Sequence, residues 1–149
     1  MSPDPALLDA SAVRLGLTAE DKADALRQCG DVLVEIGAAS AAYAAALHER
    51  ERSVSTYVGE GVAIPHGTNE SREHIERAAL AYLQFPDGVD WDGQTVHVCV
   101  AIASTSEEHV DILSALAQVL MDPAKAQALR EAQSADAVLA LLSPQATQE

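Results

Sequence analysis

The sequence has 149 residues, of which 48% are hydrophobic and only 3% aromatic. This length predicts one domain over residues 1–149, with loose ends at about residues 1–10 and 143–149. Its 23 acidic and 9 basic residues give a formal net charge of -14. That charge argues against nucleic acid or anionic lipid as a partner and favours a basic protein surface, unless the acidic surface serves solubility alone.

No targeting or membrane-spanning segment is predicted. The first five residues lack the cationic and apolar regions of a signal peptide, and no apolar run approaches the length of a membrane span. We therefore expect a cytoplasmic protein without direct membrane insertion. Cys29 and Cys99 have no metal-ligand spacing around them, and we interpret both as small buried hydrophobic residues.

The first predicted elements are a strand and two helices. Residues 12–17 predict a strand, after which Thr18 is the predicted N-cap of a helix that ends at Gly37. A second helix is predicted to begin after Ser40. Helices and strands continue to alternate along the chain, which is typical of an α/β fold.

The second predicted helix carries Tyr43, Leu47 and Arg50 on one face, at steps of four and three residues. This spacing directs the Arg50 guanidinium inward or along the edge of the domain, where it would need an anionic partner. The periodicity leaves open a local salt bridge instead, with the alkyl stem of Arg50 packed on apolar surface.

A short apolar run stops at a histidine. Residues 62–64 predict a buried strand, which is followed directly by Pro65-His66-Gly67. Pro65 fixes φ, and Gly67 has no Cβ and allows a sharp turn, so the backbone would position the His66 ring while leaving room for another molecule. This suits a nucleophile; the alternative is a histidine in an ordinary surface turn.

The segment after this histidine mixes polar and apolar signals. Residues 69–76 predict a polar turn with a brief helix, in which we interpret His74 as solvated. Residues 77–85 fit either a helix or a strand. Asp87-Gly88 and Asp92-Gly93 are turn signals.

Residues 95–103 form the strongest strand prediction, because apolar residues fill both of its faces. One face carries Val96, Val98, Val100 and Ile102, and the other carries His97, Cys99 and Ala101. We interpret His97 as a partly buried residue of the sheet.

This strand leads into a predicted helix that runs through Met121 and that Thr105 and Glu108 would cap. His109 falls in its first turn, where the helix dipole disfavours a charged imidazole and keeps the ring a neutral hydrogen-bonding group. The alternative is an exposed histidine without a function. Two further helices are predicted over residues 123–132 and 134–142.

Together, His66, His109 and Arg50 suit phosphoryl transfer. A neutral imidazole nitrogen can attack phosphorus, while a helix N-terminus and a guanidinium hold the charge on the phosphoryl oxygens. A zinc hydrolase is disfavoured because the sequence has no His-Glu-x-x-His or paired-cysteine pattern. A serine or cysteine triad is disfavoured because there is no nucleophile-elbow motif and Cys99 lies in a predicted strand.

Four segments carry a resemblance to a known family. They are Arg50-Glu51, Thr-Tyr-Val-Gly-Glu-Gly-Val-Ala-Ile-Pro-His-Gly-Thr at residues 56–68, Phe-Pro-Asp-Gly-Val at residues 85–89, and Glu108-His109-Val110. They resemble the IIA domain of the phosphoenolpyruvate-dependent sugar phosphotransferase system, mannitol/fructose type. The similarity extends from about residue 13 to about residue 142. The block of residues 57–68 looks most like the mannitol branch.

The resemblance implies a three-layer α/β/α fold with a mixed sheet of about five strands, one of them over residues 79–85. It also implies that His66 accepts a phosphoryl group on Nε2 from the carrier protein HPr. His66 would pass this group to a cysteine of the EIIB domain of a sugar permease, which phosphorylates mannitol or a related sugar as the membrane domain imports it. His109 matches the second active-site histidine, Arg50 the active-site arginine, and Glu60 a carboxylate close to the site.

The resemblance implies no metal or organic cofactor. HPr docks in this family on an apolar patch around the histidine, with acidic residues outside it, which agrees with the charge of this chain. A monomer is the simpler expectation for such transient docking. Two alternatives stay open: a regulatory module of the nitrogen type, whose phosphorylation state controls a partner protein, and a structural protein in which no histidine is reactive.

Overall fold

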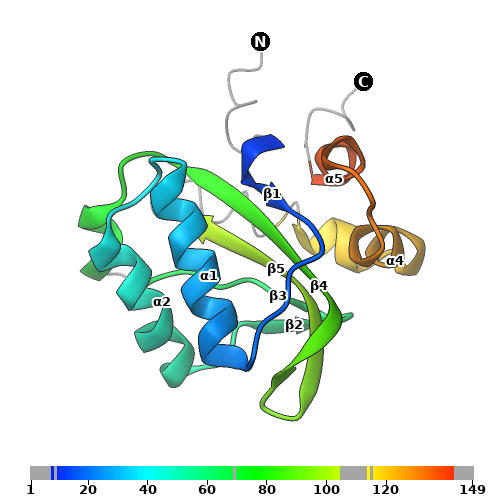
Figure 1. Ribbon diagram of the computed structural model, residues 1–149, viewed down its shortest axis with the longest axis horizontal. Coiled ribbons are helices and arrows are strands. Elements are labelled where there is room, and N and C mark those ends of the chain that lie inside the picture. The colour runs from blue at the N-terminus through cyan, green and yellow to red at the C-terminus, as the bar shows by residue number, and fades with distance from the viewer. Residues whose placement is uncertain (1–7, 9, 69, 105–113, 115, 143–149) are drawn as a thin grey trace.

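The computed structural model describes residues 8, 10–68, 70–104, 114 and 116–142. A five-stranded sheet lies between two layers of helices (Figure 1). The strands are β1 (Val13–Arg14), β2 (Tyr57–Gly59), β3 (Val62–Ala63), β4 (Ala79–Trp91) and β5 (Gln94–Ala103). Among the described residues, the α-helices with assigned bounds are α1 (Lys22–Glu35), α2 (Ala41–Ser53), α4 (Pro123–Arg130) and α5 (Ala135–Leu142). The short 3-10 helices with assigned bounds there are η2 (Ala10–Ala12) and η3 (Glu70–His74).

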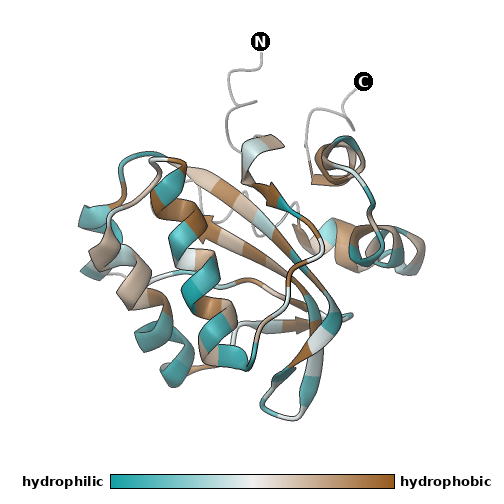
Figure 2. Ribbon diagram, in the orientation of Figure 1, coloured by the Kyte–Doolittle hydropathy of each residue, from teal (hydrophilic) through white to brown (hydrophobic). Residues whose placement is uncertain are grey.

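The sheet is mixed, with the strand order β1-β4-β5-β3-β2. β1 is parallel to β4 and β3 is parallel to β5, whereas β4–β5 and β2–β3 are antiparallel pairs. One hydrophobic cluster joins the sheet to α1 and α2, and a second joins its other face to α4 and α5. Figure 2 shows the hydrophobic residues along β4 and β5. The three-layer α/β/α prediction is therefore confirmed, as is a strand over residues 79–85.

The start of α1 differs from the prediction. Asp21, not Thr18, is the N-cap, and its side chain accepts a hydrogen bond from the amide of Asp24 at 2.9 Å. The segment before Asp21 is still hydrogen-bonded to the sheet, because the amide of Leu17 donates to the carbonyl of Gln84 at 2.9 Å. That tertiary contact delays the helix by one turn. The predicted end is confirmed, since Gly37 follows the helix with φ 76°.

α1 and α2 pack closely at a glycine. A Cβ built on Gly30 would lie 2.6 Å from the Cβ of Ala44, so only glycine fits at this position of α1. The predicted start of α2 is confirmed, with Ser40 at its N-cap position. α4 begins at Pro123, as predicted, and Asp122 caps it by accepting hydrogen bonds from the amides of Ala124 and Lys125.

The two turn signals near residue 90 have different outcomes. Asp92-Gly93 connects β4 to β5, with φ 57° and 96°, as a tight hairpin requires. Asp87-Gly88 was predicted as a turn and this prediction is wrong, because both residues lie within β4. The register of the β4–β5 pair shifts between Gln84 and Val89, and Gly88, with φ 83°, lies in that irregular stretch.

β5 also has an irregularity, and it changes which face of the sheet its first residues occupy. Val98, Val100 and Ile102 share one face, as predicted, and this face packs toward α4 and α5. Val96 belongs to the cluster on the opposite face, so its predicted face is wrong. The amides of His97 and Val98 both donate to the carbonyl of Gly61, at 2.8 and 3.2 Å. Two successive amides on one acceptor break the alternation at His97, and a pattern of period two cannot predict such a break.

Within the described part of the chain, no helix is long and apolar enough to cross a membrane. Residues 116–120 are helical, which agrees with the C-terminal part of the predicted helix through Met121. Its predicted capping residues, Thr105 and Glu108, and the candidate site residue His109 lie outside the described residues.

Candidate functional site

His66 lies at the edge of the sheet where β3 and β5 end. Because these strands are parallel, their C-terminal ends meet at the same edge. The amide of Ile102 donates to the carbonyl of Pro65 at 2.9 Å, and His66 forms an isolated parallel bridge with Ile102. Residues 62–65 are buried, whereas the His66 ring is half-buried. The predicted histidine at the end of a buried strand is confirmed.

A hydrogen bond determines which ring nitrogen of His66 carries the proton. Nδ1 lies 2.9 Å from the carbonyl oxygen of Ile64. A carbonyl oxygen only accepts, so Nδ1 carries the hydrogen, and in the neutral ring Nε2 has the lone pair. In the neutral ring, Nε2 is therefore the nitrogen whose lone pair could attack an electrophile.

The surroundings of His66 lower its pKa. Burial of the ring is the largest cause, and the positive charges of Arg50 and Arg72 act in the same direction. The hydrogen bond to Ile64 and the negative charge of Glu51 act in the opposite direction and do not outweigh them. The ring is therefore neutral at pH 7, as a nitrogen nucleophile must be.

We expect the His66 ring to titrate below its ordinary value of 6.5. The unfolded chain then binds a proton more readily than the folded chain, so the free energy of unfolding decreases as the pH falls from 6.5 toward the pKa of the folded state. Above that window this contribution is constant. Titration of the His66 imidazole resonances by NMR, in the folded chain and in urea, measures both pKa values. A folded-state pKa at or above the value in urea would contradict this expectation.

Tyr43 of α2 anchors the backbone next to His66. Its buried hydroxyl donates to the carbonyl of Ile102 at 2.7 Å and accepts from the amide of Gly67 at 2.9 Å. A Cβ on Gly67 would lie 2.5 Å from both the Tyr43 ring and the Ser71 hydroxyl. Gly67 is therefore needed for close packing, and its φ is not in the left-handed range that the predicted sharp turn suggested.

We expect Tyr43→Phe to lower the free energy of unfolding by about 1–2 kcal/mol and to slow the phosphoryl acceptance that the family resemblance implies for His66. The reason is that the substitution leaves the amide of Gly67 and the carbonyl of Ile102 without this partner while keeping the ring. Urea unfolding and the initial rate of phosphorylation measure the two effects. Tyr57→Phe is the matched control. It also removes a tyrosine hydroxyl, but among the described residues this hydroxyl accepts only one hydrogen bond, from the amide of Gly61 at the longer distance of 3.3 Å. Two variants with equal behaviour would contradict the anchoring role.

Arg50 and His66 line the same pocket, which has a volume of about 430 Å³. Its lining residues are Glu49, Arg50, Ser53, His66, Gly67, Thr68 and Arg72. The Arg50 guanidinium donates to the carbonyl of Val54 at 2.7 Å, and among the described residues it makes no salt bridge to a carboxylate. The structure therefore brings two of the predicted site residues together. It adds Arg72, a residue that no sequence pattern had indicated for the site.

Glu60 lies at the turn between β2 and β3, outside the lining of that pocket. The Nη1 atom of Arg130 contacts its carbonyl oxygen at 2.8 Å and its carboxylate at 3.4 Å. Glu60 has φ 57°, a strained backbone for a residue other than glycine. The roles predicted for Glu60 and His109 stay predictions.

A second buried feature, a carboxylate network, lies beside Arg50. Glu51 is only 4% exposed. It accepts hydrogen bonds from the Thr56 amide at 3.1 Å and from the indole of Trp91 at 3.0 Å, and it pairs with Lys22 at 3.3 Å. These contacts join α1, the end of α2, the segment before β2 and the β4–β5 hairpin. The network holds the end of the helix that carries Arg50.

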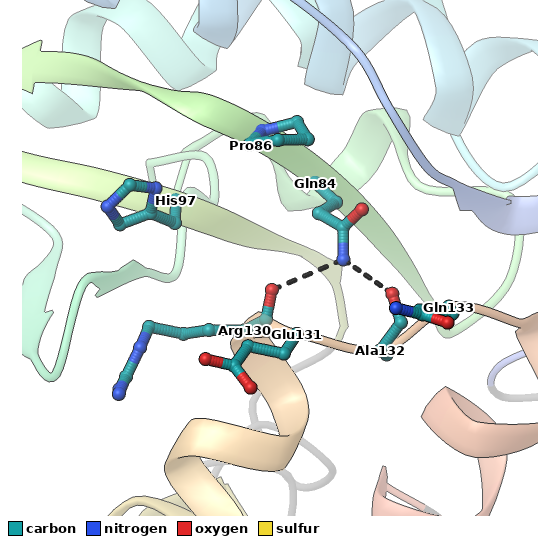
Figure 3. A pocket seen from close by; sticks show the side chains of 7 residues that line it. All are labelled: Gln84, Pro86, His97, Arg130, Glu131, Ala132 and Gln133. Carbon is teal, nitrogen blue, oxygen red and sulfur yellow. Dashed lines mark hydrogen bonds between the residues drawn. The ribbon is translucent and has the colours of Figure 1, made fainter.

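A larger pocket, of about 520 Å³, lies on the other face of the sheet (Figure 3). Its lining includes Gln84, His97 and Arg130, but these groups already have protein partners. The amide of Gln84 donates to the carbonyls of Ala132 and Arg130, at 2.8 and 3.2 Å, and the Arg130 guanidinium binds Glu60. The contacts of Gln84 hold the segment between α4 and α5 against the sheet. We therefore interpret the residues of this pocket as structural and not as a binding site. Within the described ranges, no three His, Cys, Asp or Glu side chains are grouped to hold a metal ion.

Comparison with known proteins finds similarity along nearly the whole chain. The family model of the phosphoenolpyruvate-dependent sugar phosphotransferase system, EIIA 2, matches residues 6–144. The mannitol-specific phosphotransferase enzyme IIA component of Staphylococcus aureus is 39% identical over 83% of this chain and 86% of that protein. Multiphosphoryl transfer proteins of Xanthomonas campestris and Escherichia coli O157:H7 are 41% and 38% identical over 86% and 91% of this chain. This chain spans only 15% and 36% of their lengths.

Two solved structures illustrate the similarity of fold. One is the complex of mannitol enzyme IIA with phosphorylated mannitol enzyme IIB from Escherichia coli, with a TM-score of 0.84 and 30% identity over 93% of this chain and 99% of that chain. The other is the nitrogen regulatory protein IIA-Ntr of Neisseria meningitidis, with a TM-score of 0.78 and 27% identity over 92% of this chain and 97% of that chain.

Proposed function

Because this chain belongs to the EIIA 2 family of the phosphoenolpyruvate-dependent sugar phosphotransferase system, we propose that it carries a phosphoryl group on Nε2 of His66. The donor is phosphorylated HPr, and the acceptor is the cysteine of an EIIB domain. The observation that carries this proposal is the bond from His66 Nδ1 to the carbonyl of Ile64, which leaves the lone pair on Nε2. The pocket of Arg50 lies beside that ring.

The transfer to this chain exchanges one phosphorus–nitrogen bond for another. The Nε2 lone pair of His66 attacks phosphorus, the bond to the donor nitrogen breaks, and its electron pair returns to the donor ring. Nδ1 of His66 keeps its hydrogen, which stays bonded to the carbonyl of Ile64. In the second transfer a cysteine thiolate attacks, and the electron pair returns to Nε2. Positioning and electrostatic stabilisation supply most of the catalysis in such a reaction.

Arg50 stabilises the charge on the phosphoryl oxygens, and Tyr43 acts through the backbone by holding Gly67. His109 serves as a hydrogen-bond partner of the ring or of the phosphoryl group, and Glu60 supplies a carboxylate near the site. The support for His109 and Glu60 is their match to the family's residues, and both fall within the matched range of 6–144.

We further propose that this chain acts on the cytoplasmic side of the membrane, in a pathway that takes up mannitol or a related sugar or polyol. The similarity to the Staphylococcus aureus mannitol component supports this choice. The Escherichia coli complex with phosphorylated enzyme IIB supports an EIIB domain as the acceptor.

Intact-protein mass spectrometry at neutral to basic pH tests the carrier role. The chain is incubated with phosphoenolpyruvate, enzyme I and HPr, and one acid-labile phosphoryl group is expected. Addition of a competent EIIB domain should then remove it. A folded chain that acquires no phosphoryl group from a competent HPr would refute the proposal.

The alternative function is a regulatory module whose phosphorylation state controls a partner protein. The similarity to IIA-Ntr of Neisseria meningitidis supports it. The two functions differ in the second transfer, since a regulatory module would accept the phosphoryl group without passing it to an EIIB cysteine. Deletion of the gene should abolish growth on the transported sugar only if the chain serves transport.

A further inference from the structure

A second arginine shares the pocket of His66. Arg72 lies on the 3-10 helix η3 and lines the pocket together with His66 and Arg50. After burial of the ring and the Arg50 charge, the Arg72 charge is a further cause that lowers the pKa of His66. The same guanidinium also acts on the hydroxyl of Tyr43, where it opposes the raising of that pKa by burial. Arg72 therefore lies close to the two residues that form and anchor the site.

The fold holds η3 at both ends, which gives Arg72 a defined place on the pocket wall. At the start, the buried Ser71 donates from its hydroxyl to the carbonyl of Thr68 at 2.7 Å and from its amide to the Thr68 hydroxyl at 3.3 Å. At the end, the carbonyl of His74 accepts from the amide of Ser40 at 3.0 Å. These bonds place the backbone that carries Arg72 against the rest of the fold.

Among the described residues, no carboxylate forms an ion pair with Arg72. Within the described residues its guanidinium makes no hydrogen bond or ion pair, whereas Arg50 donates to a backbone carbonyl. Glu49 also lines the pocket but is exposed and pairs with neither arginine there. The negative charge of Glu51 acts on His66, yet its carboxylate is already bound by Thr56, Trp91 and Lys22.

Two guanidinium groups beside a neutral imidazole match the charge of a phosphoryl group, which carries close to two negative charges at neutral pH. We propose that Arg72, together with Arg50, binds the phosphoryl oxygens while the group is on His66 and while it is transferred. This inference rests on the proposed phosphorylation of His66 and adds a catalytic residue to it.

The test compares Arg72→Gln and Arg72→Lys with wild type and with Arg52→Gln. Arg52 is an exposed arginine of α2 that does not line the pocket, so its substitution changes the net charge by the same amount. Each protein receives a phosphoryl group from phosphorylated HPr and, separately, from phosphoramidate, a small donor that needs no protein docking. We expect Arg72→Gln to slow both reactions about tenfold to a hundredfold, Arg72→Lys to slow them less, and Arg52→Gln to change neither.

The His66 pKa is the second measurement, because it needs no donor. Titration by NMR should give a higher pKa in Arg72→Gln than in wild type and no change in Arg52→Gln. Equal rates in Arg72→Gln and wild type, or an unchanged His66 pKa, would overturn the role of Arg72. A loss with phosphorylated HPr but not with phosphoramidate would also overturn it and assign Arg72 to docking.

The outcomes separate this inference from the function on which it rests. If wild type accepts no phosphoryl group from either donor, the carrier role fails. If wild type is phosphorylated and Arg72→Gln behaves like it, the carrier role stands and only the role of Arg72 fails. Should Arg72→Gln unfold in the control urea titration, Arg72→Lys decides the question, because a retained charge with a different geometry should still slow transfer and leave the His66 pKa lowered.

Discussion

Replacement of His66 by glutamine is expected to abolish phosphoryl acceptance. The glutamine amide nitrogen has no lone pair available for attack, so no phosphorus–nitrogen bond can form, although the side chain can still occupy the half-buried site. The fold should remain, because the strand that precedes residue 66 is held by β5 and not by the ring. Intact mass after incubation with phosphorylated HPr measures the loss, which should be complete.

His74→Gln is the matched control for this experiment. The His74 side chain is 39% exposed and lies 3.6 Å from Glu73 at the surface, outside the pocket of His66. Its substitution should leave the rate and the extent of phosphorylation unchanged. An acid-labile phosphoryl group on His66→Gln, or its loss in His74→Gln, would show that His66 is not the acceptor.

Replacement of Glu51 by alanine is expected to lower the free energy of unfolding by about 3 kcal/mol. The carboxylate is buried and serves as acceptor for Thr56, Trp91 and Lys22 at once. Its removal leaves the buried amide of Thr56 and the indole of Trp91 without an acceptor, whereas Lys22 keeps Asp92 at 2.6 Å. Because the network joins four elements, the loss should appear in global unfolding.

Urea denaturation of Glu51→Ala, Glu51→Gln and Glu73→Ala checks this expectation. Glutamine retains one carbonyl oxygen as an acceptor and should recover part of the stability. Glu73 is 77% exposed, so its substitution should change the free energy of unfolding by less than about 0.5 kcal/mol. If Glu51→Ala were as stable as Glu73→Ala, the network would contribute nothing to the fold.

Local patterns predicted much of the framework. The buried run before Pro65, the helix after Ser40 and the strand over residues 95–103 all occur, because hydrophobic periodicity and capping act between residues close in sequence. Cys29 and Cys99 are buried, as interpreted. The strand over residues 79–85 was ambiguous by periodicity and followed only from the family resemblance.

The two local predictions that were wrong, the N-cap at Thr18 and the turn at Asp87-Gly88, have a common physical cause. Thr18 is a good N-cap residue, yet the segment around it stays extended because Leu17 bonds to Gln84, 67 residues later in the chain. Asp87-Gly88 is a good turn signal, yet β4 continues through it because β5 pairs with the strand on both sides. In each case a contact between distant residues outweighed a local preference of the backbone.

The sequence by itself determined the family, the class of fold and the histidine at the end of a buried strand, because these depend on patterns within short segments. Only the tertiary structure showed that Arg50 and Arg72 line one pocket with His66 and that the Tyr43 hydroxyl binds the amide of Gly67. It also showed that the Ile64 carbonyl binds Nδ1 of His66, which leaves the lone pair of the neutral ring on Nε2. The physical reason is that charges and hydrogen bonds act through space. The separation of residues along the sequence does not tell which side chains of α2, η3 and the end of β3 lie close enough to interact.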